Sequence, residues 1–243
     1  MKLPSFRHHH YFLPGFLGLA LLVVLGGIVL AIKDIEDIGF NTAPRAAPAP
    51  TLDFADYDRR MRRLAHVPES ATDTDGLAWP AKAAYPEVGA ILPFKRVVAY
   101  YGNFLAKGMG VLGEYPEDVM LEKFRKEIAA WEAADPETPV MPAIDYIAIT
   151  AQLSPGDDGM HRARMPYKEI DKALALAEKV DGIVILEVQA GLSDVMDEVR
   201  SLEPYLMKPN VHLAIDPEFA MRKSGMRPGT VVGTVDAAQV NEA

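Results

Sequence analysis

Acidic side chains stand at the ends of several apolar runs in the second half of the sequence. Asp145, Glu187 and Asp216 each lie at the carboxyl end of a predicted strand, with Glu114 in the loop after the first strand and Glu218 just beyond Asp216. The carboxyl ends of parallel strands meet at one edge of a sheet, so we expect these groups to gather there. Glycoside hydrolysis needs two such carboxyl groups, one protonated and one ionised. We therefore predict a glycosidase-like catalytic site at Asp145, Glu187 and Asp216, with Glu187 as acid and Asp216 as nucleophile or base.

Polar and aromatic side chains near these acids are predicted to bind the ligand: Tyr100, Tyr101, Asn103, Glu114, Tyr146, Gln189, His212 and Glu218. Aromatic platforms with carboxylates serve sugar binding and sugar hydrolysis alike, so a non-catalytic module for a carbohydrate or cell-wall ligand is the alternative function. A structural interpretation also stays open. Asp216, Pro217 and Glu218 match a turn and helix cap, and acids at strand ends often accept backbone N–H groups.

Other chemistries have weaker support. The chain has no cysteine, which removes thiol catalysis and cysteine-bound zinc. It has no H-E-x-x-H and no G-x-S-x-G motif, which argues against a zinc peptidase site and a serine hydrolase elbow. An all-carboxylate calcium or magnesium site at Asp145, Glu187 and Asp216 stays open. We predict no cofactor and no resident metal.

Three glycines, Gly108, Gly110 and Gly113, spell a literal G-x-G-x-x-G. In a dinucleotide site these glycines follow a strand directly and open a helix. Here they lie several residues past Gly102, and the next predicted helix begins with Glu117 and Asp118, whose charge would repel a pyrophosphate. The motif therefore indicates a loop between a strand and a helix.

Strands and helices alternate from residue 96 onward. Apolar runs predict strands at 97–101, 140–147, 183–188, 211–215 and 231–235, and helical periodicity predicts helices at 117–134, 166–180 and 193–207. Alternation of this kind implies a parallel sheet with right-handed crossovers.

The phase of the strands predicts which face meets the helices. On the strand 183–188, Val184, Leu186 and Val188 form a wholly apolar face, while the other face ends in Glu187 and Gln189. A face that turns polar toward the strand ends is typical of a barrel opening into a site, so we predict a TIM-like (β/α) barrel; a doubly wound open sheet is the alternative. About five strands fit, whereas a closed barrel has eight, so we expect an apparently truncated barrel.

The N-terminal part predicts a membrane anchor. Residues 11–32 carry no charge and are long enough to span a bilayer, so we predict a transmembrane signal anchor after a cytoplasmic stub at 1–10. Lys2 and Arg7 precede the span and acids follow it, which places the C-terminal domain outside the cytoplasm by the positive-inside rule. Residues 33–93 are predicted to be an extracytoplasmic spacer rich in Pro and Ala, a short helix and a loop, and residues 94–243 the barrel.

The predicted partners follow from charge. A net charge of -9 argues against binding the phosphate backbone, so we predict no nucleic-acid partner. The helix within 53–65 carries clustered arginines, which fit either a capping helix with a solvated basic face or contact with anionic lipid headgroups. We favour the capping helix.

Five motifs carry a family resemblance: 100-YYGN-103, 110-GVLGE-114, 142-PAIDY-146, 187-EVQAG-191 and 211-VHLAIDPE-218. Together they resemble a family of exported bacterial proteins of unassigned function that have a predicted glycoside-hydrolase-like barrel. The resemblance covers residues 94–243. It implies a barrel that continues through further strands, and it implies no substrate.

Overall fold

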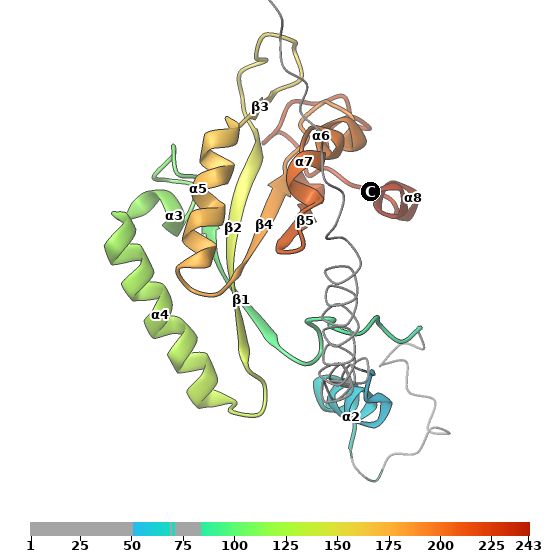
Figure 1. Cartoon of the computed structure of the whole chain (residues 1–243). Helices are drawn as coiled ribbons and strands as arrows, with labels where there is room; N and C mark the ends of the chain where they lie inside the picture. Colours follow the sequence, from blue (N-terminus) through green and yellow to red (C-terminus); the bar gives the residue numbers. More distant parts are fainter. Residues whose placement is uncertain (1–50, 69, 71–83) are drawn as a thin grey trace, which may run out of the picture. The chain divides into compact units, whose positions relative to one another are not determined.

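The computed structural model describes residues 51–68, 70 and 84–243 (Figure 1). The predicted stub and signal anchor, and the first part of the predicted spacer, lie outside these residues. Among the residues described, none of the helices combines the length and the apolar character needed to cross a bilayer.

The domain is a mixed α/β fold around a five-stranded sheet. Four strands pair in parallel in the order β1 (Arg96–Gly102), β2 (Val140–Ala151), β4 (Ile183–Val188) and β5 (Val211–Ile215). The short β3 (Arg162–Arg164) returns antiparallel to the end of β2. The parallel strands follow one another in sequence order without the reversal that defines a doubly wound sheet. This order is compatible with part of a (β/α) fold.

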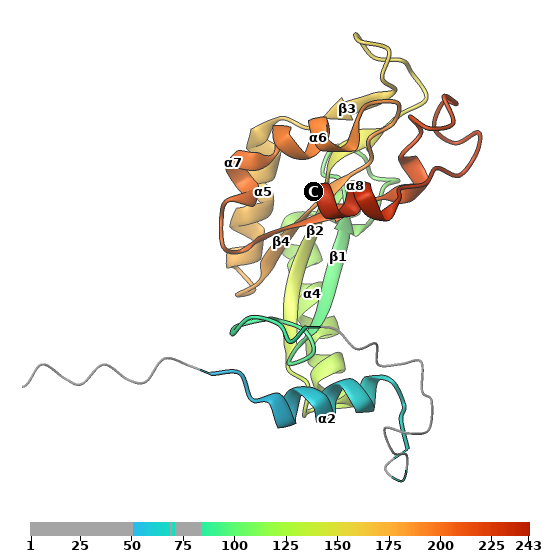
Figure 2. The same cartoon turned by 90° about the vertical axis from the view of Figure 1, so that its right-hand side faces the viewer.

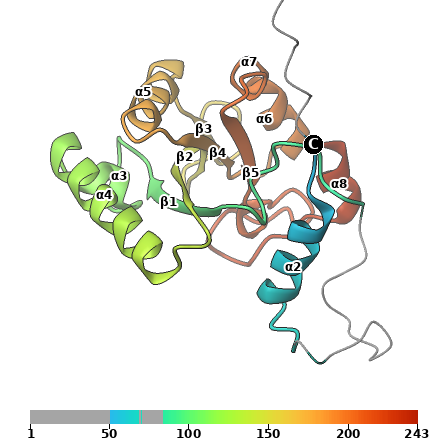
Figure 3. The ribbon, with the colours of Figure 1, turned by 60° about the horizontal axis from the view of Figure 1, so that its bottom comes forward.

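Helices connect the parallel strands. The connections contain α3 (Val111–Glu114) and α4 (Glu117–Ala134), then α5 (Tyr167–Glu178), then α6 (Val195–Ser201) and α7 (Glu203–Leu206). Figures 2 and 3 show α4, α5, α6 and α7 along the outer side of the curved sheet. After β5 come the 3₁₀ turn η1 (Pro217–Phe219) and α8 (Ala237–Glu242).

The core lies between the sheet and these helices. On β2 and β4 the side chains that alternate toward the helices, such as Ile144, Tyr146, Val184 and Leu186, are completely buried. Phe124 of α4 is buried with them and belongs to the same apolar cluster. Val184, Leu186 and Val188 belong to one apolar cluster with residues of the helices, which confirms the predicted helix-facing side of β4. The opposite, concave face carries the acids.

One predicted strand is wrong. The segment 231–235 forms no strand; its valines Val231 and Val232 are 45% and 75% exposed. The N–H of Gly233 donates to the Glu218 carbonyl oxygen at 2.7 Å, and a Cβ at Gly233 would lie 2.7 Å from the Ala220 carbonyl oxygen. Gly233 therefore packs this loop against the chain after β5, and the exposed valines show that a short apolar run alone does not establish a strand.

The loop after β1 is built by close backbone packing at its glycines. Gly102 and Gly110 have φ of 141° and 109°, and a Cβ on Gly110 would lie 2.4 Å from the Tyr101 carbonyl oxygen. A Cβ on Gly113 would lie 2.3 Å from the Asn103 carbonyl oxygen. The glycines at 110 and 113 thus fold the loop onto the end of β1, which explains them without a bound phosphate.

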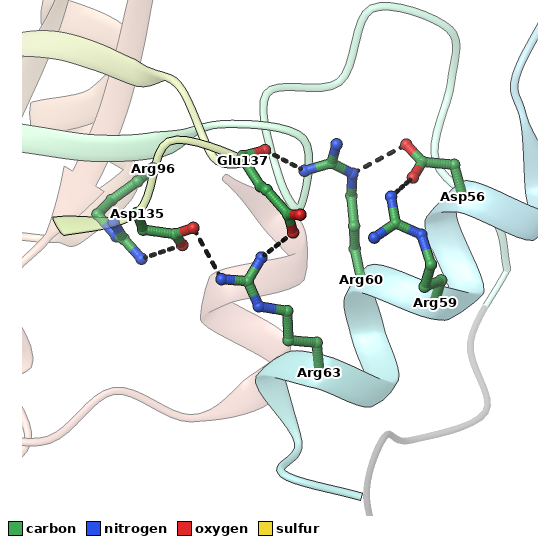
Figure 4. Close-up of polar contacts among 7 residues, drawn as sticks. All are labelled: Asp56, Arg59, Arg60, Arg63, Arg96, Asp135 and Glu137. Atoms are coloured by element: carbon green, nitrogen blue, oxygen red, sulfur yellow. Dashed lines mark hydrogen bonds and ion pairs between the residues drawn. The ribbon is translucent and has the colours of Figure 1, made fainter. Parts of the chain in front are cut away.

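Arginine side chains tie the helix α2 (Phe54–Leu64) to the base of the domain. Arg63 donates to Asp135 Oδ1 at 2.7 Å and to Glu137 Oε2 at 3.1 Å, beyond the end of α4. Asp135 also accepts from Arg96 of β1 at 3.1 Å (Figure 4). These contacts dock α2 against the domain through arginines of the basic face, which was expected from the sequence to be solvated.

Candidate functional site

The concave face of the sheet brings two of the predicted catalytic acids together. The register pairs Asp145 of β2 with Ile185, and Ile147 of β2 with Glu187. Because side chains two residues apart share a face, Asp145 and Glu187 lie on the same side of neighbouring strands. The negative charge of Glu187 acts on Asp145 and helps to raise the pKa of Asp145. From the sequence, strand phase predicts this face for Glu187, and Asp145 is expected to end its strand; β2 continues to Ala151, so Asp145 lies in the middle of the strand.

Glu187 is held by two hydrogen-bond donors. Its Oε1 accepts from the Tyr101 hydroxyl at 3.0 Å and from Gln189 Nε2 at 2.8 Å. Gln189 is itself fixed, since its Oε1 accepts from the Ala151 N–H at 3.0 Å. Burial raises the pKa of Glu187, while these donors act against that rise by stabilising the ionised form.

Asp145, unlike Glu187, has no hydrogen-bond donor among the described residues at its buried carboxyl oxygen, Oδ1. Burial, followed by the charge of Glu187, raises the pKa of Asp145 to about 7. Two carboxyl groups in unlike environments are the arrangement by which enzymes separate an acid from a base.

Asp216 lies at the edge of this group. Its Oδ1 accepts from the Glu218 N–H at 2.9 Å, so Asp216 caps the turn η1. The negative charge of Asp216 also contributes to the raised pKa of Glu187 and Tyr101. The cap that the sequence offered as a structural alternative is therefore formed, and the Asp216 charge still acts on Glu187. Glu218 is exposed beside it.

Two predicted ligand-binding tyrosines face away from the acids. Tyr100 stacks on Phe124 of α4 with ring centroids 4.4 Å apart, and Tyr146 stacks on Phe104 at 4.8 Å. Both are on the helix side because they alternate with Tyr101 and Asp145 along their strands. Burial raises the pKa of Tyr146, and its hydroxyl is buried without a partner among the described residues. Tyr101 is thus the tyrosine that the sheet places with the acids.

Asn103 is occupied by the fold. It is 2% exposed, and its Nδ2 donates to the Ile147 carbonyl oxygen at 3.1 Å while its Oδ1 accepts from the Leu105 N–H at 2.8 Å. These bonds fasten the loop after β1 to β2. Glu114 is exposed at the end of α3, and its hydrogen bond with Tyr115 raises the pKa of that tyrosine. His212 is half-buried on the concave face of β5.

A buried acid that the sequence did not single out is Glu198 of α6. It is completely buried and accepts from Arg162 and Arg164 of β3, each at 2.7 Å from Nε. The signal was present, because Glu198 falls within the apolar stripe formed by Val195, Val199 and Leu202. Its role is to join β3 to α6.

Two further features bear on the choice of site. Among the described residues no group of three or more potential ligands could hold a metal ion. A surface groove of about 400 Å³ is lined by residues including Arg125, Glu132, Pro142 and Lys179, at the amino-terminal end of the sheet. In (β/α) folds that end carries stability, and chemistry takes place at the carboxyl ends, so we place the candidate site at the acids.

Comparisons with protein-family descriptions, with curated proteins and with solved structures found no match. The family resemblance of the motifs therefore stays a prediction.

Proposed function

We propose that this domain is part of a (β/α) barrel that acts as a glycoside-hydrolase-like enzyme through paired carboxyl groups. The observation that carries the proposal is the unlike bonding of Asp145, in the middle of β2, and Glu187, near the end of β4, on one face of the sheet. Glu187 has two donors on one oxygen, whereas Asp145 has a buried oxygen without a partner among the described residues. A glycosidase requires this difference, because one carboxyl group must give a proton and the other must stay ionised.

The bonding favours a division of roles other than the one expected from sequence. Donors stabilise a carboxylate, so Glu187 is the better nucleophile or base. Desolvation disfavours charge, so Asp145 is the better general acid, with a pKa of about 7. Asp216, which caps η1, then acts through its charge on Glu187.

A non-catalytic module that binds a carbohydrate or cell-wall ligand is the second candidate. It is favoured by the burial of Asp145 Oδ1, because a buried oxygen is poorly placed to reach a glycosidic bond. Tyr101, 38% exposed, would provide the aromatic surface for a sugar ring.

The test compares the full chain with its Asp145→Asn and Glu187→Gln variants on a panel of bacterial and host glycans, scoring cleavage and binding separately. The enzyme proposal expects cleavage that falls by at least about 100-fold in each variant while binding persists. Glu122→Gln, on the exposed side of α4, is the matched control and should keep full activity. If the parent protein binds a glycan and never cleaves one, the enzyme proposal is rejected and the non-catalytic binding module is retained.

We also propose that residues 11–32 anchor the domain in the membrane with the domain outside the cytoplasm. The support is the uncharged run and the charge asymmetry around it. A reporter fused after Thr51 should be active only outside the cytoplasm. Activity of that fusion inside the cytoplasm would overturn the proposed orientation.

A further inference from the structure

The side chain of Tyr101 reaches over a neighbouring strand. Tyr101 lies on β1 and Glu187 on β4, and β2 lies between them in the sheet. The Tyr101 hydroxyl nevertheless donates to Glu187 Oε1 at 3.0 Å. The register sets Tyr101 directly beside Asp145 of β2. The phenol side chain must therefore cross β2 on the face that carries Asp145.

We propose that Tyr101 is a positioning residue of the acid pair: its ring covers Asp145 and its hydroxyl fixes Glu187 as the anion, so that the proton held by the pair resides on Asp145. The importance of this arrangement for catalysis rests on the proposed function. The inference differs from the sequence prediction, in which Tyr101 binds a ligand.

The surroundings of Asp145 support this assignment. The titratable groups on the concave face around it are Tyr101 from β1, Glu187 from β4, His212 from β5 and Asp216 beyond β5. Within the described part of the chain no side-chain hydrogen bond or ion pair reaches the Asp145 carboxyl group, and its Oδ1 is buried, which favours the protonated form. Burial is the larger cause of its raised pKa and the charge of Glu187 the smaller.

The surroundings of Tyr101 fit the same arrangement. Burial, and then the charge and hydrogen bond of Glu187, raise the pKa of Tyr101 far above its ordinary value, so the hydroxyl keeps its proton and acts as a donor. Gln189 Nε2 lies 3.5 Å from the Tyr101 oxygen and 2.8 Å from Glu187 Oε1. The hydroxyl and the amide thus converge on one carboxylate oxygen and hold the ring in place over β2.

Two substitutions separate the effect of the Tyr101 ring over Asp145 from the effect of its hydrogen bond to Glu187. Tyr101→Phe keeps the ring and removes the hydroxyl, and Tyr101→Ala removes both. The measurement is a pH titration of the full chain with ¹³C-labelled Asp and Glu carboxyl groups, followed by NMR, with Asp145→Asn and Glu187→Gln identifying the two signals. Tyr85→Phe and Tyr85→Ala are matched controls, because the Tyr85 hydroxyl also bonds a carboxylate, Asp58 Oδ2, at 3.0 Å on an exposed surface.

In the parent chain we expect the Asp145 signal to titrate near pH 7. In Tyr101→Ala its midpoint should fall by at least about one pH unit toward the ordinary aspartate value of about 4. In Tyr101→Phe the Asp145 midpoint should stay above that of the Ala variant, while the Glu187 midpoint should rise because a donor is lost. The Tyr85 variants should move neither signal.

The inference is overturned if Asp145 titrates near its ordinary value in the parent chain, or if its midpoint is unchanged in a Tyr101→Ala variant that gives a native-like spectrum. Should Tyr101→Ala fail to fold, Tyr101→Phe still decides, because an unmoved Glu187 midpoint in that variant refutes the role of the hydroxyl. The titration uses no glycan, so its failure is separate from a failure to find cleavage.

Discussion

Arg164 and Glu198 form a two-point ion pair that joins β3 to α6. Arg164 Nε lies 2.7 Å from Glu198 Oε2, and Arg164 Nη2 lies 3.1 Å from Oε1. Arg162 Nε donates to the same Oε1 at 2.7 Å. Burial raises the pKa of Glu198, but the hydrogen bonds from Arg164 and Arg162 outweigh it and hold that pKa below the ordinary value. The completely buried Glu198 thus has a structural role, in contrast to the acids proposed for catalysis.

Replacing Glu198 by Ala should therefore destabilise the domain. The change leaves Arg162, whose side chain is 11% exposed, without its buried partner. We expect the free energy of unfolding to fall by about 2–3 kcal/mol, less than for a wholly buried pair because Arg164 is 48% exposed. Urea unfolding at pH 7 measures this.

The adjacent Asp197→Ala is the control, because Asp197 and its partner Arg200 are both exposed and 3.5 Å apart. It should change stability by no more than about 0.5 kcal/mol. Equal losses in the two variants would contradict a structural role for the buried pair. Since the pKa of Glu198 is lowered, its stabilisation should be complete above the ordinary glutamate value of about 4.3 and be lost on further acidification.

Asp145→Asn should have the opposite effect on stability. The pKa of Asp145 is about 7 in the folded chain and about 4 when unfolded, so the folded state binds the extra proton between these values. Stability contributed by this group is therefore present at pH 4 and is lost as the pH rises through 7. Three pKa units correspond to about 4 kcal/mol, and because Asp145 is only partly buried we expect about half of this as the gain of the variant at pH 8, vanishing near pH 4.

Urea unfolding of the two chains from pH 4 to pH 8 checks this pH dependence, with Asp157→Asn in the exposed loop before β3 as control. A parent chain as stable as Asp145→Asn at pH 8 would show that burial of this carboxyl group carries no penalty. A gain in stability on removing a proposed catalytic group is a usual mark of a functional site.

The glycines after β1 can be tested one against another. Gly110→Ala places a Cβ 2.4 Å from the Tyr101 carbonyl oxygen at a φ of 109°, so we expect a loss of at least about 2 kcal/mol. Gly108→Ala meets nothing within 4 Å and should leave stability within about 1 kcal/mol of the parent. Thermal unfolding of both variants distinguishes them. Equal effects would contradict the packing explanation of this loop.

Strand phase predicted which side chains of one strand share a face, and no more than that. Alternation within β4 placed Glu187 opposite Leu186, and the structure has them on opposite faces. The reach of Tyr101 from β1 to β4 was beyond prediction, because it depends on the register of three strands. The prediction that Asn103 binds a ligand met a related difficulty. Its side chain bonds the Ile147 carbonyl oxygen and the Leu105 N–H, and bonds to backbone groups cannot be recognised from residue types.

Helices were predicted closely where their periodicity is long. The range 117–134 is the observed α4, and 166–180 differs from α5 by one or two residues at each end. The range 193–207 is divided into α6 and α7, which meet at Leu202; Pro204 lies in the first turn of α7. The strand β3 was missed, because three residues with two arginines carry no apolar alternation.

The docking of α2 gives the last prediction. Arg63 bonds Asp135, and this hydrogen bond is the first cause that lowers the pKa of Asp135 to about 2 (Figure 4). Because Asp135 then stays ionised well below neutral pH, mild acid should leave α2 docked, whereas salt should weaken these exposed ion pairs. Arg63→Gln should therefore speed amide hydrogen exchange in α2 several-fold while the exchange of β2 and β4 stays unchanged.

Arg59→Gln is the matched control, since Arg59 pairs with Asp56 within the same helix. High salt should speed α2 exchange in the parent chain and add little in Arg63→Gln. If α2 exchanges alike in both variants, the pairing of Arg63 does not hold it.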